Sequence, residues 1–256
     1  ELVIYRDGKY LNLSEVFESI GMTSHELNID TLDMRADKNT FHRFDRFNLK
    51  YNPCGQSRLR EIFIKSDNLI RGRFLAELTK EVLTDLEANK YTMAEYRLSI
   101  YGRRKAEWDS LAAWVLNHGL FSKNIVWMIQ LPRLFNIYRA QGTMKNFQQM
   151  LDNIFIPLFE VTIDPSSHPE LHHFLKTVVG FDMVDDESKP ERRPNQHMRV
   201  PEDWNVNHNP AYSYYAYYVY ANLYTLNKLR ESKGMNIITF RPHAGEAGDI
   251  DHLATT

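Results

Sequence analysis

The sequence predicts an α/β protein built from consecutive parallel βα units. Short apolar runs of strand length alternate along the chain with longer stretches in which apolar residues recur at helical spacing. Such alternation is typical of parallel sheets whose strands are joined by helices. Neither an internal repeat nor a low-complexity tract interrupts the pattern, and 256 residues suffice for one large domain with a sizeable core.

The apolar pattern places each element. Strands are expected at residues 98–101, 125–131, 181–184 and 237–240. Helices are expected at 12–20, 74–86, 108–116, 147–154 and 171–178, and a tyrosine-lined helix is expected to end near Lys233, where Gly234 can cap it. The polar, proline-rich stretch 189–209 is expected to be a loop.

Two sheet architectures compete for this pattern. An open, doubly wound sheet usually carries a glycine-rich phosphate loop after its first strand, and this chain has none. A segment of a (β/α)8 TIM-type barrel fits better, although four strands are too few to close a barrel of eight. We therefore expect part of such a barrel, with its first and last strands outside residues 1–256.

The composition excludes several classes of protein. A net charge of −2, with 43% hydrophobic and 25% charged residues, does not fit a general nucleic-acid or membrane-surface binder. The single cysteine, Cys54, rules out an internal disulfide and a cysteine-rich zinc site, and it fits a reducing compartment such as the cytoplasm. The uncharged stretch Asn209–Asn227 is long enough for a membrane span, but its seven tyrosines and Pro210 indicate a buried helix.

The chemistry of an α/β barrel takes place at the C-terminal ends of its strands. In chain order, the expected strand ends supply Tyr101 and Arg103, then Gln130 and Arg133, then Asp185, Asp186 and Glu187, and finally Arg241, His243 and Glu246. Strand ends are also polar simply because solvent reaches them, so composition alone leaves both explanations open.

The segment FRPHAGEAG at residues 240–248 has a more specific pattern. A strand directly before His243 would hold its imidazole rigidly, as a metal ligand requires. Gly245 and Gly248 permit a tight turn, so Glu246 can point back toward the same cavity. A carboxylate there would serve as the acid/base partner of a zinc-bound water. A helix-cap arrangement is the alternative explanation of this His-x-x-Glu spacing.

FRPHAGEAGDIDHL at 240–253 resembles a strand-end motif of the adenosine and AMP deaminases. Further blocks are similar to AMP deaminases in particular, above all to plant-type members. These blocks are FHRFDRFNLKYNPCG at 41–55, LSIYGR at 98–103, QLPRL at 130–134, GFDMVDDESKP at 180–190 and NLYTLN at 222–227. The resemblance covers the chain almost end to end.

This resemblance implies a barrel enzyme with one zinc ion, held by three histidines and an aspartate. His243 matches the third histidine. The chain has no His-x-His pair, so the first two histidines are expected before Glu1 and the aspartate after Thr256. One ligand of four is too few for tight zinc binding, and the fragment alone is expected to be inactive.

The resemblance also implies the reaction and the substrate-binding residues. Glu246 matches the glutamate that exchanges a proton with N1 of the purine while a zinc-activated water attacks C6, converting AMP to IMP and ammonia. Residues 1–60 are expected to be a substrate-binding loop region and 61–256 successive βα units. The candidate substrate-binding residues are Arg46, Phe47, Asn48, Leu49, Lys50, Tyr51, Asp185 and Glu246; Arg46 stands where most members have a lysine.

Two other functions stay open at this point. The chain could belong to an aminohydrolase for another purine nucleoside, or to a catalytically inactive barrel that serves as an interaction or regulatory module. For the leading hypothesis we expect AMP as substrate, zinc as cofactor, no nucleic acid, no membrane span in this chain, a cytoplasmic location and a homo-oligomeric full enzyme.

Overall fold

The structure is a computed structural model, and it describes residues 3–6, 8–19, 21, 65, 71–89, 91–187, 189 and 198–248. The chain divides into two units, Glu1–Lys80 and Glu81–Thr256, which we describe separately. In the first unit, β1 (Val3–Arg6) and β2 (Lys9–Asn12) form an antiparallel hairpin, followed by α1 (Leu13–Ser19). The sequence analysis predicted the helix but not the hairpin.

The start of α1 has a reciprocal capping arrangement. The backbone N–H of Glu15 donates to Asn12 Oδ1 at 2.9 Å, and the backbone N–H of Asn12 donates to Glu15 Oε2 at 2.7 Å. Two backbone donors that the helix cannot satisfy internally are thereby paired, which fixes the helix start.

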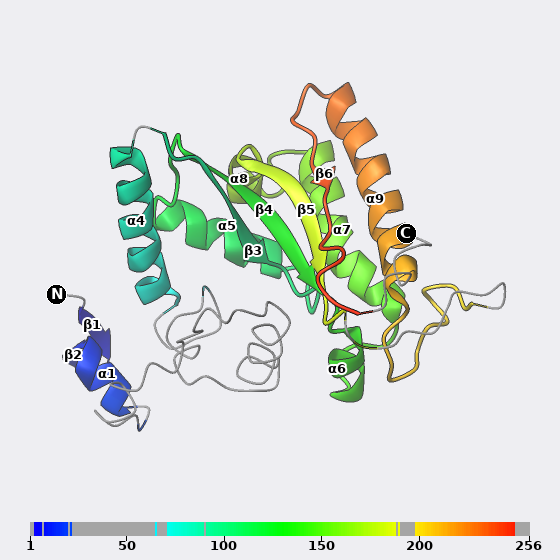
Figure 1. Cartoon of the computed structure of the whole chain (residues 1–256), viewed down its shortest axis with the longest axis horizontal. Coiled ribbons are helices and arrows are strands. Elements are labelled where there is room, and N and C mark those ends of the chain that lie inside the picture. The colour runs from blue at the N-terminus through cyan, green and yellow to red at the C-terminus, as the bar shows by residue number, and fades with distance from the viewer. Residues whose placement is uncertain are drawn as a thin grey trace. The chain divides into compact units, whose positions relative to one another are not determined.

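The second unit contains a parallel four-stranded sheet. Its strands are β3 (Ala94–Ser99), β4 (Ile125–Pro132), β5 (Val178–Val184) and β6 (Thr239–Phe240), and they lie side by side in chain order (Figure 1). The helices are α5 (Glu107–Asn117), α6 (Phe135–Ala140), α7 (Phe147–Ile163), α8 (Pro169–Leu175) and α9 (Tyr212–Ser232). A further helix, α4 (Arg73–Ala88), spans the boundary between the two units. The predicted parallel βα organisation is confirmed.

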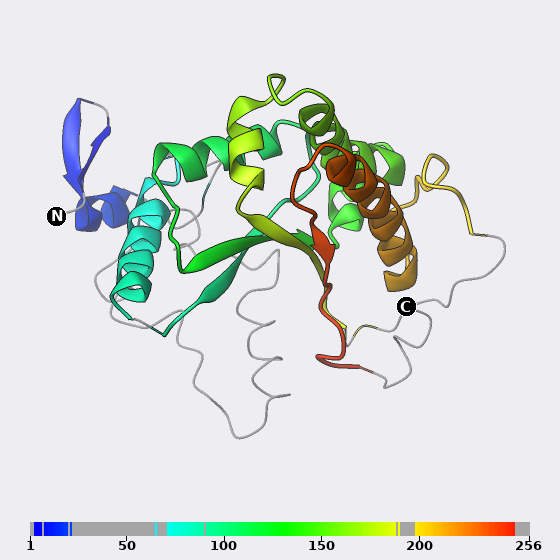
Figure 2. The ribbon, with the colours of Figure 1, turned by 90° about the horizontal axis from the view of Figure 1, so that it is seen from above.

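The helices α5, α7, α8 and α9 all lie on one face of this sheet (Figure 2). A doubly wound sheet has helices on both faces, whereas a barrel has them only outside. Within the described residues of the second unit, no helix covers the other face. Strand order and one-sided covering therefore favour a barrel segment over the doubly wound alternative.

The core lies between the sheet and these helices. Phe181 of β5 stacks on Phe155 of α7 with 6.0 Å between ring centroids, and buried Trp108 of α5 donates its indole N–H to the carbonyl of Ile154 at 2.8 Å. Burying each large aromatic side chain contributes roughly 2 to 3 kcal/mol, and the paired indole avoids the cost of an unsatisfied donor. This layer holds the strands in register and so positions their C-terminal ends.

The tyrosine-rich segment forms α9, as predicted, and one side of it is buried. Tyr215 is fully buried and packs edge-on against Phe147 of α7, with 4.6 Å between centroids. On the opposite side, Tyr217 and Tyr224 are exposed. In the described part of the chain, every helix is too short or too polar to cross a bilayer.

Four elements differ from the sequence prediction. The strand expected at 98–101 is β3, which begins earlier because Glu95 and Arg97 point to a polar face where both are paired. Val178 belongs to β5 rather than to the preceding helix, and α6 was not predicted. The strand expected at 237–240 shortens to β6, because the backbone of Ile238 pairs with the Asn227 side chain instead of with β5.

Candidate active site

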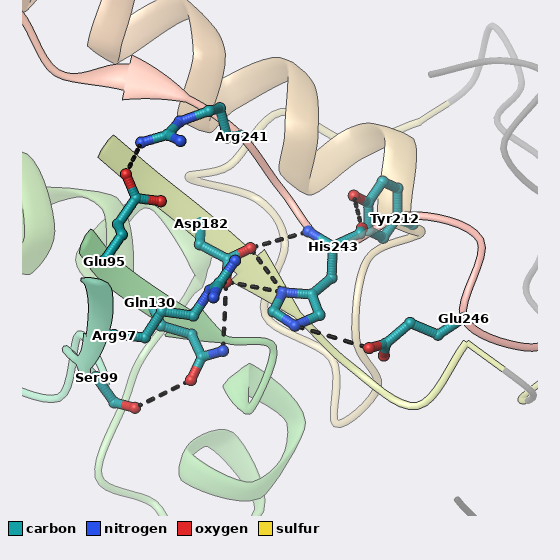
Figure 3. A network of polar contacts seen from close by, with 9 residues as sticks. All are labelled: Glu95, Arg97, Ser99, Gln130, Asp182, Tyr212, Arg241, His243 and Glu246. Carbon is teal, nitrogen blue, oxygen red and sulfur yellow. Dashed lines mark hydrogen bonds and ion pairs between the residues drawn. The ribbon is translucent and has the colours of Figure 1, made fainter. Parts of the chain in front are cut away.

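The sheet face turned away from the helices is polar. Phe181 points toward α7, so the next residue along β5, Asp182, points to the opposite face. Side chains from neighbouring strands converge on it there. The cluster consists of Arg97 of β3, Gln130 of β4, Asp182 of β5 and His243, which follows β6 (Figure 3).

Asp182 lies at the centre of this cluster with its side chain 0% exposed. Arg97 Nε donates to Asp182 Oδ2 at 2.8 Å, and Gln130 Nε2 donates to the same oxygen at 3.3 Å. The backbone N–H of His243 donates to Oδ1 at 2.9 Å, and ring atom Nδ1 of His243 lies 2.8 Å from Oδ1 and 2.7 Å from Oδ2. A buried carboxylate is stable only with such partners, because an unpaired buried charge is strongly destabilising.

These contacts stabilise the ionised form of Asp182. Burial raises the pKa of this carboxyl group, but the hydrogen bonds and charges of His243 and Arg97 outweigh burial and hold the pKa below its ordinary value. The hydrogen bond that His243 donates to Asp182 raises the pKa of His243, against the opposing effect of burial. Asp182 therefore acts as an acceptor and keeps a proton on Nδ1, which leaves Nε2 with the available lone pair when the ring is neutral.

The backbone of His243 is also fixed. Its N–H donates to the carbonyl of Met183 at 3.0 Å, which extends the pairing of β5 and β6 beyond the end of β6. Its carbonyl accepts a hydrogen bond at 2.7 Å from the hydroxyl of Tyr212, the first residue of α9. Because ring and backbone are both held, little conformational freedom is lost when the imidazole binds a ligand.

Glu246 lies on the turn that follows His243. Gly245 has a φ of 84°, a left-handed conformation that glycine adopts without steric cost, so the tight turn expected at this position is present. Glu246 Oε1 is 3.8 Å from His243 Nε2, and the Glu246 side chain is 38% exposed (Figure 3). The carboxylate thus borders the side of the imidazole that faces away from Asp182.

A second ion pair crosses the same face of the sheet. Arg241 NH2 lies 2.7 Å from Glu95 Oε2, which links the two outer strands of the described sheet. A Cβ atom added to Gly180 of β5 would lie 2.7 Å from Arg241 NH2 and 3.1 Å from Met128 atoms. Glycine at position 180 therefore leaves the space through which the Arg241 side chain passes.

Several strand-end candidates have structural contacts instead. Arg133 is buried and donates from NH2 to the carbonyl of Pro210 at 2.8 Å, which anchors the segment before α9. The backbone N–H groups of Tyr101 and Arg103 donate to the buried carboxylate of Glu107 at 2.8 and 3.1 Å. These contacts hold loops at the C-terminal ends of β3 and β4.

The assignment of the predicted substrate-binding residues stays a prediction. Asp185 Oδ2 is 3.6 Å from Arg133 NH1, and no described contact joins it to His243, so its role in purine recognition stays a prediction. The segment predicted to bind the substrate, which consists of Arg46, Phe47, Asn48, Leu49, Lys50 and Tyr51, lies outside the described residues.

Sequence reasoning missed three residues of the site: Arg97, Asp182 and Tyr212. Asp182 had a detectable signal, because it is a single charged residue within an otherwise apolar strand, between Phe181 and Met183. A charge at such a position must be paired, and the pairing partner is frequently functional. Nothing in the local sequence distinguishes Tyr212 from the six other tyrosines of its segment.

The orientation of His243 can be compared with that of a zinc ligand. Metal-binding imidazoles commonly donate one ring N–H to a carboxylate and bind the metal through the other nitrogen, which is the arrangement of His243 with Asp182. Among the described residues, no group of three or more His, Cys, Asp or Glu side chains could hold a metal ion. The contacts of His243 are therefore compatible with the predicted role of a zinc ligand, which stays a prediction.

Comparison with known proteins decides the family. A family model described as AMP deaminase matches residues 1–256. The chain belongs to the AMP deaminase family. Its relatives include a protein named "Probable AMP deaminase" in Oryza sativa subsp. japonica, which is 70% identical over 254 residues. Proteins named "AMP deaminase" in Arabidopsis thaliana and Saccharomyces cerevisiae are 70% identical over 256 residues and 54% identical over 255 residues, respectively.

These family members are much longer than the chain. The matches cover 99%, 100% and 100% of the chain, but 31%, 30% and 32% of the rice, Arabidopsis and yeast proteins respectively. The chain thus spans about a third of the length of the curated relatives that it matches.

Proposed function

We propose that the complete protein containing this chain catalyses the hydrolytic deamination of AMP to IMP and ammonia. The observation that carries the proposal is the arrangement of His243 and Glu246 at the C-terminal end of β6. Nε2 of His243 faces away from Asp182, and the Glu246 carboxylate lies 3.8 Å from it. Membership of the AMP deaminase family over the whole chain supports AMP as the substrate.

Each residue of the cluster has a distinct task in this reaction. Asp182 keeps the proton on Nδ1 of His243, so Nε2 can serve as a ligand for zinc. When bound, zinc would supply Lewis acidity and a nucleophilic water near neutral pH. Glu246 donates a proton to N1 of the purine as oxygen adds at C6, so the ring accepts the electron pair. The proton of the new C6 hydroxyl then passes to the amino group, the C6–N bond breaks to release ammonia, and the carbonyl of IMP remains.

We further propose that the cations of the segment 46–51 select AMP over adenosine. The phosphate of AMP carries nearly two negative charges at neutral pH, so a preference for the nucleotide requires cations near its position. Arg46 and Lys50 would supply two such cations. Arg46 presents a planar fork where a lysine would present a point charge, so its contact with phosphate would be bidentate.

The two alternative functions have less support. An inactive interaction module does not need the paired geometry of Asp182, His243 and Glu246, and an enzyme for an unphosphorylated nucleoside does not need two cations at 46–51. A cytoplasmic location, expected from the single cysteine, and homo-oligomeric assembly, implied by the resemblance, stay predictions.

Replacing Glu246 by glutamine in the complete protein tests the proposed reaction. Glutamine keeps the size and polarity of the side chain but cannot transfer the proton. General acid–base groups contribute about 10² to 10⁴-fold, so we expect kcat for AMP to fall by at least that range, while bound zinc is unchanged. If kcat is unaffected, the proposed acid–base role is wrong, and if zinc is lost, Glu246 supports the metal instead.

A further inference from the structure

We propose that Glu187 is a positioning residue for Glu246: its carboxylate fixes the turn that places the Glu246 side chain beside His243. This inference rests on the proposed role of Glu246 in proton transfer. It gives a function to a residue that lies outside the cluster around Asp182.

The contact joins two loops at the C-terminal end of the sheet. Glu187 lies in the loop that follows β5, and only 7% of its surface is exposed. Its Oε2 atom accepts hydrogen bonds from the backbone N–H groups of Gly245 at 2.8 Å and of Glu246 at 3.1 Å. One buried carboxylate oxygen from the β5 loop therefore holds two consecutive N–H groups of the loop that carries Glu246.

A carboxylate suits this contact for electrostatic reasons. Successive backbone N–H groups that point the same way form a small positive pocket, and here the left-handed conformation of Gly245 accompanies this arrangement. Hydrogen bonds to an ionised acceptor are roughly twice as strong as neutral ones. With its N–H held, the backbone of Glu246 is fixed, and only its side-chain torsions can move the carboxylate relative to His243.

A purely structural role is the alternative. Glu107 shows that a buried glutamate can anchor a loop in this fold, because its carboxylate accepts the backbone N–H groups of Tyr101, Gly102 and Arg103. If Glu187 were such an anchor only, its removal would affect stability without depending on the chemistry of Glu246. A double-mutant cycle between Glu187 and Glu246 separates the two roles.

The cycle is measured in the complete, zinc-bound protein with AMP as substrate. Misplacing a reacting group by about 1 Å can cost about a hundredfold, so we expect Glu187→Ala to lower kcat by about tenfold to a hundredfold, with KM and bound zinc little changed. In the Glu246→Gln background, Glu187→Ala should change kcat by less than about twofold, because the side chain at position 246, which Glu187 positions, no longer transfers protons. Glu187→Gln keeps an acceptor oxygen at the same position and should restore most of kcat.

Amide hydrogen exchange gives a second measurement that is independent of activity. The N–H groups of Gly245 and Glu246 should exchange faster in Glu187→Ala than in the wild type. Asp164→Ala is the matched control: its carboxylate accepts the backbone N–H of Ser166 at 2.9 Å in the turn after α7. This control should change neither kcat nor the exchange of these two amides.

The outcomes separate this inference from the proposed function. The positioning role would be overturned if the effects of the two substitutions on log kcat simply added in the double variant. It would also be overturned if Glu187→Ala left the exchange of the two amides unchanged or lost its zinc. If the wild type releases no ammonia from AMP, or Glu246→Gln keeps full kcat, the proposed function fails instead, and amide exchange still reports whether Glu187 holds the turn.

Discussion

At the scale of single residues, the buried carboxylate of Asp182 orients the imidazole of His243. Asp182→Asn keeps the shape but replaces one acceptor oxygen by an amide donor, which cannot accept from Arg97 or from Nδ1 of His243. Residues that orient metal ligands typically contribute about 10 to 100-fold to metal affinity, and we expect that loss here. Competition with a chelator measures zinc affinity in the complete protein.

The matched control for this change is Asp109→Asn. Asp109 Oδ1 lies 2.8 Å from Nδ1 of His168, so it forms a carboxylate–imidazole pair of the same length outside the candidate site. Zinc affinity should be unchanged in this variant. Equal zinc affinity in Asp182→Asn and the wild type would show that Asp182 does not orient a metal ligand.

Substrate choice also belongs to the scale of single residues. A charge-assisted hydrogen bond contributes roughly 1.5 to 3 kcal/mol, so Lys50→Ala should lower kcat/KM for AMP by about tenfold to a hundredfold. The loss should be mostly in KM, because the phosphate is remote from C6 and its contact changes little in the transition state. Kinetics with adenosine serve as the control, since adenosine has no phosphate and its rate should not change. Equal losses for both substrates would indicate a structural role for Lys50.

The sequence alone indicated His243 and Glu246, but not Asp182 and Tyr212, which contact His243 in the fold. His243 and Glu246 lie close together in one motif, so their spacing alone suggested a shared site. The partners of His243 lie far from it in sequence: Tyr212 on a helix is 31 residues away, and Asp182 on a strand is 61 residues away. Contacts of this kind depend on strand register, which local sequence does not specify.

At the scale of elements, the glycine at position 180 leaves room for the Arg241 side chain to pass over β5. A methyl group there would meet the Arg241 guanidinium at 2.7 Å and displace it from Glu95. Overpacking typically costs about 1 to 3 kcal/mol, and the end of the Arg241 side chain can shift, so we expect Gly180→Ala to lower the free energy of unfolding by about 1 kcal/mol, measured by urea denaturation. In an Arg241→Ala background the cost should be smaller. A cost that is the same in both backgrounds would show that Arg241 is not the group displaced.

The elements themselves were predictable where one face is uniformly apolar. Helices α5, α7 and α9 follow from the spacing of residues that pack on the sheet, and β4 from its continuous apolar run. Prediction was poorer for β3, because its alternate residues Glu95 and Arg97 lie on the polar face of the sheet and interrupt the apolar signal.

At the scale of the whole molecule, the described sheet has the strand order and one-sided helix layer of a barrel segment. A barrel gathers the C-terminal ends of all its strands around one site, so ligands from distant parts of a longer chain can meet there. If the complete protein closes such a barrel, His243 could meet metal ligands from other parts of the longer chain, since the described residues contain no group of three metal-binding side chains.

Bound zinc in two variants of the complete protein tests the central claim most directly, that His243 binds the metal while Glu246 transfers the proton. We expect His243→Ala to lose both equimolar zinc and ammonia release from AMP, because one ligand of the site is removed. Glu246→Gln should keep its zinc and lose only activity. Equimolar zinc in purified His243→Ala would contradict the account.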